Sequence, residues 1–192
     1  MQNGNVWVLT KRSHLLWKST LEAMKDDRNS KLMEVDEDIL KRKPIKKMYV
    51  DPMGVHCFLL AEHEIFYNHW GSNRVFQVMT KPQEGQAASQ QPKAFRSVDL
   101  QYQSPLDRSS FEVLLGTEDG NIFHAAFQWT PQGLNTMKHI NWVFQTPDYR
   151  PILDLKIAKI AGNQVVLAIT ENSLHQFHSN RNQNIREIFQ EY

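Results

Sequence analysis

The sequence predicts an all-β protein made of repeated antiparallel units, and three observations lead to that fold class. Short apolar runs alternate with polar turns along the chain, as in successive β-strands. Related runs recur at intervals of about fifty residues. Segments with helical periodicity are few. A unit of this length that holds four strands is typical of one blade of a β-propeller.

Two signatures define the repeat. In the first, an Asp follows apolar residues, and it occurs at Asp51, Asp99 and Asp154. In the second, two apolar strands flank a polar turn, at residues 6–17, 58–67, 114–123 and 167–177. Further apolar runs at residues 74–79 and 139–144 supply a fourth strand. We therefore expect three to four four-stranded blades, with boundaries near residues 1–44, 45–80, 95–146 and 151–192.

The turn residues stand where the repeat places connections between strands. Residues 51–54 (Asp-Pro-Met-Gly) have Asp at the first turn position, Pro at the second and Gly at the fourth, the preferences of a type I turn. Residues 119–121 (Asp-Gly-Asn) favour the positive φ angles of a tight hairpin. Residues 130–133 separate the third strand of that unit from the fourth.

Two segments are also compatible with an amphipathic helix, residues 15–24 and 185–192. In the second, apolar residues fall at positions i, i+3, i+4 and i+7, namely Ile185, Ile188, Phe189 and Tyr192. The phase of the repeat places a fourth strand at the C-terminus instead, and we predict a strand there. Residues 81–94 hold two prolines and four glutamines, and we predict a long solvated loop between blades.

The number of repeats bears on how much of the fold this chain holds. A ring of blades must close, and three to four partial blades leave the terminal blades with bare apolar faces. We therefore expect the N-terminal part of a larger ring, of seven blades, with the remainder of the protein outside this chain.

The composition restricts the classes of function. The 22 basic and 21 acidic residues give a formal net charge of +1, so the totals provide no field for nucleic acid or a membrane surface. The basic run at residues 41–47 has phosphates, lipid headgroups or an import receptor as candidate partners. We interpret it as a solvated linker, since an acidic patch precedes it and no stacking aromatics interrupt it. With no signal peptide and no apolar stretch near 18 residues, we expect a soluble cytosolic chain.

The lone cysteine, Cys57, permits no intramolecular disulfide and is expected to be a small buried hydrophobe. A metal site is one interpretation of the residues around it, which include His56, His63 and His69. Neighbours in a strand point to opposite faces, however, and the motif H-E-x-x-H fails because Tyr67 stands in place of its second His. We predict turn and edge histidines here and assign no metal ligand.

The sequence shows no catalytic motif. G-x-S-x-G is absent, and residues 116–120 (Gly-Thr-Glu-Asp-Gly) lack the Lys and the following helix that a phosphate loop needs. Asp51, Asp99 and Asp154 could form carboxylate pairs in the channel of a propeller, as in propeller glycosidases. Their recurrence once per blade favours a repeated turn or capping interaction. We assign no catalytic or cofactor-binding residue and expect no cofactor in this region.

Three segments resemble a known family, in its order and at plausible spacing. Residues 45–56 (Ile-Lys-Lys-Met-Tyr-Val-Asp-Pro-Met-Gly-Val-His) are similar to the strand and the Asp-Pro-x-Gly-x-His turn of the vacuolar protein sorting subunits called deep orange in flies. Residues 114–123 resemble the family's Gly-Thr-x-x-Gly-x-Ile-aromatic strand pair, and residues 189–192 its Phe-x-x-Tyr element. Met53, Val55 and the bulky pair at 57–58 depart from the family's pattern. The resemblance covers residues 1–192.

The resemblance implies an N-terminal β-propeller that is followed, in the family, by an α-solenoid and a RING-type zinc module beyond residue 192. It implies a non-catalytic core subunit of the HOPS and CORVET tethers, which act in vesicle docking, membrane fusion and vacuolar protein sorting. The implied partners are the other class C subunits, Rab GTPases and SNAREs. The implied location is peripheral, through partners, on the cytosolic face of late endosomes and the vacuole or lysosome. Nucleic acid is not among the implied partners, and no metal residue transfers to this chain.

Two other functions stay open. One is the propeller of another trafficking or coat-like scaffold, as in clathrin or nucleoporins. The other is a propeller hydrolase with carboxylates in its channel. Because propeller interfaces use loops and blade edges that carry no local motif, we assign no partner-binding residues from the sequence.

Overall fold

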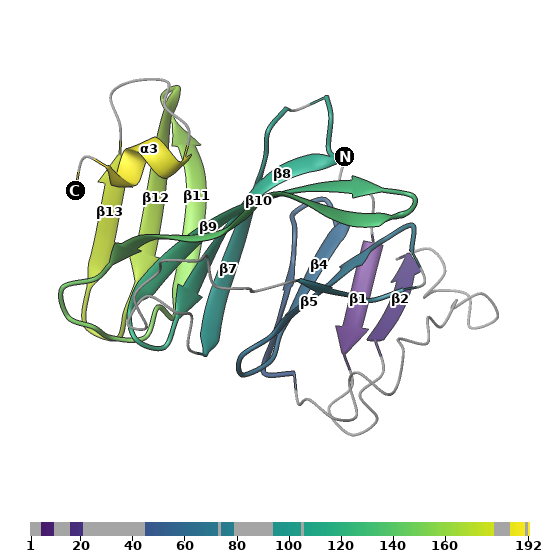
Figure 1. Cartoon of the computed structure of the whole chain (residues 1–192), viewed down its shortest axis with the longest axis horizontal. Coiled ribbons are helices and arrows are strands. Elements are labelled where there is room, and N and C mark those ends of the chain that lie inside the picture. Colours follow the sequence, from purple (N-terminus) through teal and green to yellow (C-terminus); the bar gives the residue numbers. More distant parts are fainter. Residues whose placement is uncertain are drawn as a thin grey trace. The chain divides into compact units, whose positions relative to one another are not determined.

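The computed structural model describes residues 5–9, 16–20, 45–72, 74–78, 94–104, 106–178, 185–190 and 192. Most of these residues lie in β-strands, as Figure 1 shows. The chain divides into two compact units, Met1–Val78 and Met79–Tyr192. Residues 81–93 of the predicted loop and residues 41–44 of the basic run lie outside the described residues.

The first unit contains a four-stranded antiparallel sheet whose strands follow one another in space as in sequence. Its order is β3 (Lys47–Val50), β4 (His56–Leu60), β5 (Ile65–His69) and β6 (Phe76–Val78). A second antiparallel pair is formed by β1 (Asn5–Leu9) and β2 (Leu16–Thr20), so the described part of the segment 15–24 is a strand. The extent of the blade predicted at 1–44 stays a prediction.

The turn at residues 51–54 links β3 to β4 as the sequence predicts. The Gly54 amide donates to the Asp51 carbonyl at 2.8 Å, and Gly54 has a positive φ of 67°. The Trp7 indole N–H donates to the Gly54 carbonyl at 3.0 Å, which ties β1 to this turn. Behind the turn, Cys57 is completely buried in a core that it shares with Phe66, as expected of a small hydrophobe.

The second unit contains two antiparallel sheets. The first has four strands in the order β10 (Gly133–Gln145), β9 (Asn121–Thr130), β8 (Ser110–Thr117) and β7 (Phe95–Tyr102). The second has three strands, β11 (Asp154–Ile160), β12 (Asn163–Ile169) and β13 (Leu174–His178). Successive up-and-down sheets of this kind confirm the predicted fold class, an all-β partial propeller.

The strand predicted at the C-terminus is wrong. Residues Ile185–Phe189 form a short helix, α3, which lies across β12 and β13 in Figure 1. The spacing of Ile185, Ile188 and Phe189 places all three on one face, and all three are buried. Phe189 packs against Phe177 of β13 with ring centroids 4.8 Å apart. Local helical periodicity therefore outweighs the phase of the repeat, because the helical face fills the core of this unit.

The core of the second unit lies between its two sheets and beneath α3. Its buried residues are Leu114, Ile122, Ile152, Leu155, Val166, Ala168, Phe177, Ile185, Ile188 and Phe189. At Gly116 the sheets approach so closely that an added Cβ would lie 2.6 Å from Cβ of Ile152. The first glycine of the Gly-Thr-x-x-Gly segment is therefore required by packing.

Candidate protein-interaction site

The three repeated aspartates have different surroundings in the structure. Asp51 accepts hydrogen bonds from backbone amides of its own turn, at 2.7 Å from Val55 and 2.6 Å from His56. This is the capping role that the sequence favours. Asp99 lies within β7 and is buried, whereas Asp154 is the first residue of β11 and is exposed. The repeated aspartate of the sequence therefore occupies three different environments in the structure.

Asp99 joins the two sheets of the second unit. Its Oδ2 accepts a hydrogen bond of 2.6 Å from the backbone amide of Ile157 in β11. Its carboxylate also lies 3.4 Å from Nζ of Lys156. Nearby, the Ser97 hydroxyl donates to the Ile152 carbonyl at 2.9 Å. These contacts use the carboxylate to hold one blade against the next, and they occupy its oxygens with structural donors.

The prediction of turn and edge histidines around Cys57 is right only for His63, which is exposed in the connection between β4 and β5. His56 and His69 lie in the inner strands β4 and β5. His56 is buried, and its Nδ1 lies 2.7 Å from the Tyr67 hydroxyl. The His69 ring lies edge-on to His56, and its Nδ1 accepts from the Gly71 amide at 3.0 Å. Within the described ranges, no three His, Cys, Asp or Glu side chains come together as metal ligands would.

The glycine-containing segment at 116–120 forms a hairpin connection. The Thr117 hydroxyl donates to Asp119 Oδ1 at 2.6 Å and accepts from the Asn121 amide at 3.0 Å. Gly120 takes a φ of +78°, as the sequence predicts for this turn.

Of the predicted basic run, Lys46 forms an exposed ion pair with Glu62 at 3.4 Å. Such a pair is typical of a solvated surface.

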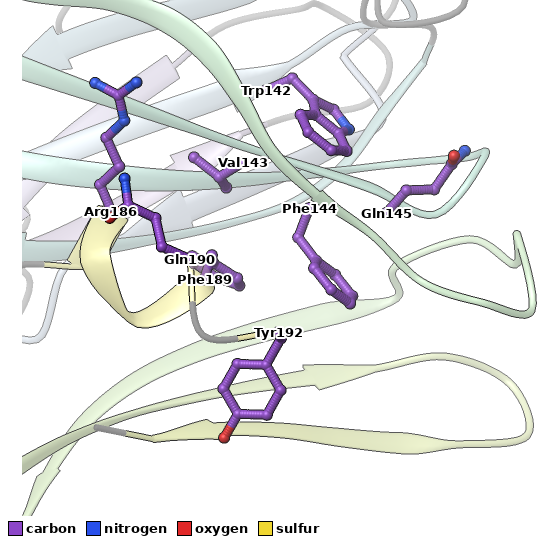
Figure 2. A pocket seen from close by; sticks show the side chains of 8 residues that line it. All are labelled: Trp142, Val143, Phe144, Gln145, Arg186, Phe189, Gln190 and Tyr192. Atoms are coloured by element: carbon purple, nitrogen blue, oxygen red, sulfur yellow. The ribbon is translucent and has the colours of Figure 1, made fainter. Parts of the chain in front are cut away.

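A pocket that the sequence did not predict lies between β10 and α3. Its volume is about 400 Å³, within the range of about 300–1,000 Å³ that is usual for ligand pockets. Figure 2 shows the side chains that line it, which come from β10, from α3, and from Gln190 and Tyr192 after the helix. They are Trp142, Val143, Phe144, Gln145, Arg186, Phe189, Gln190 and Tyr192.

The strand side of the pocket is shaped by a β-bulge. The register of β10 against β9 shifts between Trp142 and Phe144, so Val143 has no partner of its own across the ladder. Phe144 packs edge-on against Phe177 with ring centroids 4.8 Å apart. On the other side of the bulge, the Trp142 indole N–H donates to Asn121 Oδ1 at 2.9 Å. Contacts within the chain therefore hold both rings in place.

The helix side of the pocket ends on Tyr192. Its ring stands edge-on to Phe177 at a centroid distance of 5.2 Å, and 56% of the residue is exposed. Its hydroxyl accepts from the His178 amide at 3.2 Å. The helical spacing noted at 185–192 is the one sequence signal that pointed to this wall. The strand wall, more than forty residues earlier, gave no local signal.

A buried histidine–carboxylate pair lies in the sheet of β8 and β9. His124 is 1% exposed, and its Nε2 is 3.5 Å from Oε2 of Glu112. Burial acts to raise the pKa of Glu112, but its interactions with the neighbouring His124 and Lys138 lower it further than burial raises it. The net pKa of Glu112 is below its usual value of 4.5.

The sequence of this chain matches a known protein family. A family model described as the Pep3/Vps18/deep orange beta-propeller domain matches residues 3–192. A vacuolar sorting protein 18 of Arabidopsis thaliana is 26% identical over 141 residues, which are 69% of this chain and 13% of the relative. The chain thus spans about an eighth of the length of that relative.

Solved structures with a similar fold are propellers of distant sequence. The WD40 domain of SCAP from fission yeast is 14% identical with a TM-score of 0.57, over 95% of this chain and 40% of that one. An ancestral GH74 enzyme is 13% identical with a TM-score of 0.60, over 93% of this chain and 24% of that one. At these identities the likeness shows the fold alone. Among the described residues, no helix has the length and apolar character needed to cross a membrane.

Proposed function

Because this chain belongs to the Pep3/Vps18/deep orange β-propeller family, we propose that it is a non-catalytic scaffold that binds proteins in vacuolar protein sorting. The observation that carries the proposal is the match of the family model to residues 3–192, nearly the whole chain. The relative from Arabidopsis supports it, since that protein is named as a vacuolar sorting protein.

The finer proposal is a place in a membrane-tethering assembly. The chain acts as part of a core subunit of HOPS and CORVET, with the other class C subunits, Rab GTPases and SNAREs as partners. It reaches the cytosolic face of late endosome and vacuole or lysosome membranes through those partners, and it takes part in vesicle docking and fusion. The three segments of family resemblance at 45–56, 114–123 and 189–192 support this placement.

The surroundings of the aspartates support a role without catalysis. A glycosidase needs one carboxyl group that can give a proton and another that can attack or activate water. The Asp51 carboxylate accepts three backbone amides, from Met53, Val55 and His56. The Asp99 carboxylate accepts the Ile157 amide and is buried. An assay of the chain with a panel of chromogenic glycosides tests the absence of catalysis, and we expect no turnover. Hydrolysis by the parent chain that is lost when Asp51, Asp99 and Asp154 are all replaced by Asn would contradict the non-catalytic role.

Reconstitution with purified subunits tests the scaffold proposal. The chain is immobilised and incubated with recombinant class C subunits, and bound protein is identified after washing. We expect retention of at least one class C subunit. The WD40 domain of fission yeast SCAP provides a control of similar fold and should retain none. Absence of class C binding, with capture of clathrin-coat or nuclear-pore subunits in the same assay, would contradict the proposal.

A further inference from the structure

The pocket between β10 and α3 combines aromatic walls with a single cation. We propose that it binds an extended peptide segment of a partner protein, in which a large apolar side chain stands next to an acidic residue. This inference names a class of partner for the protein-binding function proposed above and rests on that function.

The apolar part of the pocket is preorganised. Phe144 and Phe189 are fixed by Phe177, and the hydrogen bond between the Tyr192 hydroxyl and His178 fixes the Tyr192 ring. Rings that are already ordered lose little conformational entropy when a partner binds. Tryptophan, tyrosine and arginine are the residues that most often dominate binding energy at interfaces, and this pocket carries all three.

The charge of the pocket selects the partner. Among the eight described residues that line it, Arg186 has the one charged side chain, and none has a side-chain carboxylate. Arg186 is exposed on α3, and the described ion pairs do not include it. A guanidinium with free donors beside an aromatic surface binds a carboxylate through two parallel hydrogen bonds. Gln190 adds an exposed uncharged polar group that can pair with a peptide backbone, whereas the Gln145 side chain already donates to the Asp119 carbonyl at 3.4 Å.

The backbone of β10 favours an extended occupant. Four consecutive residues of this strand, 142–145, form one wall of the pocket. In the described sheets β10 pairs with β9 alone and is therefore an edge strand. Edge strands accept extended peptides, whose alternate side chains enter neighbouring pockets. The bulge at Val143 interrupts the ladder at this point, so a short segment fits better than a long added strand.

Fluorescence anisotropy with three labelled nonapeptides tests the proposal on the purified chain. The probe is Gly-Ser-Gly-Phe-Asp-Glu-Gly-Ser-Gly. One control peptide has Ala in place of Phe, and the other has Lys-Lys in place of Asp-Glu. We expect the probe to bind at least about tenfold more tightly than either control, as one buried ring or one charge-assisted contact warrants. Equal affinity for the probe and either control would overturn the proposal.

Charge reversal at Arg186 makes the test specific to this pocket. The R186E variant should weaken binding of the acidic probe by about tenfold or more and should strengthen binding of the Lys-Lys peptide. The K159E variant makes the same charge change at an exposed residue of β11 and should bind like the parent chain. Thermal unfolding of both variants checks that they are folded. If K159E weakens binding as much as R186E, general electrostatics explains the result and the proposal is wrong.

The two levels of proposal fail separately. If class C subunits bind the chain while the peptides do not, the pocket proposal alone is wrong. If the peptides bind with the expected charge preference and no class C subunit is retained, the tethering proposal is wrong and the pocket proposal stands.

Discussion

The carboxylate of Asp99 in β7 accepts a hydrogen bond of 2.6 Å from the backbone amide of Ile157 in β11. Asp99 is 1% exposed, so this bond crosses from one sheet to the next in the interior of the second unit. A buried charge is stabilised only when donors surround it. The Ile157 amide and Lys156 are such donors, and the bond therefore couples the folding of two adjacent sheets.

Replacing Asp99 by Ala should lower the free energy of unfolding by about 1–3 kcal/mol, because the Ile157 amide loses its acceptor in a partly buried position. Urea denaturation followed by circular dichroism measures the change. The control is Glu171→Ala, which removes an exposed carboxylate between β12 and β13 and should change stability by less than about 0.5 kcal/mol. Equal effects of the two substitutions would show that the bridge is unimportant.

Replacing Gly116 by Ala should destabilise the second unit by about 1–3 kcal/mol through overpacking. The new methyl group would meet Cβ of Ile152 at 2.6 Å, and both lie in the core. Gly162 provides the comparison, since a Cβ there meets nothing within 4 Å and only its φ of +86° opposes the substitution. Thermal melts should rank Gly116→Ala as the more destabilising. The reverse order would contradict the packing argument.

The stability of the chain should depend on Glu112 at acidic pH. The folded-state pKa of Glu112 lies below 4.5, so Glu112 contributes stability above that pH, and the contribution is lost as the pH falls through the folded-state pKa. Urea denaturation at intervals from about pH 3 to pH 7 measures the slope. In the Glu112→Gln variant the slope below about pH 4.5 should be shallower than in the parent chain. Asp107 and Asp148 also have lowered pKa values, so the difference between the two proteins is the informative quantity.

Replacing Ile188 by Ala should destabilise α3 by about 2–5 kcal/mol, because a completely buried side chain is removed from the core. Loss of the helix also removes one wall of the pocket, so binding of the acidic peptide should fall with it. The control is Arg186→Ala on the same helix, which should leave stability within about 0.5 kcal/mol of the parent. Amide hydrogen exchange of residues 185–190 distinguishes the two variants.

The hairpins could be predicted from the sequence because their signals are local. The turns at 51–54 and 119–121 carry Gly and Asp at the positions where the backbone needs them, and the strands on either side alternate as expected. The same local reasoning would have found α3, whose apolar spacing is visible in residues 185–192. The phase of the repeat predicts a strand at the same residues, but a repeat specifies the position of a strand only where the local pattern of apolar residues agrees.

The candidate site could not be predicted in the same way. Trp142 and Arg186 are far apart in the sequence, and they line the same pocket because a helix stands beside the edge strand of the preceding sheet. Nor could the roles of the aspartates be separated from the sequence. Asp51 and Asp99 follow similar residues, but one caps its own turn and the other reaches a different sheet. These differences depend on tertiary packing, and a repeat in the sequence does not specify which residues will pack together.

Tyr192 has a second role besides lining the pocket, because its hydroxyl binds the backbone at the end of β13. Its hydroxyl accepts from the His178 amide at 3.2 Å and lies 3.4 Å from the His178 carbonyl, so it occupies both backbone groups of that residue. Unpaired backbone groups on an edge strand are a template on which other chains add as strands and aggregate. The Tyr192 ring thus both lines the pocket and protects the end of β13 from pairing with another chain. Loss of this ring should therefore increase self-association of the chain.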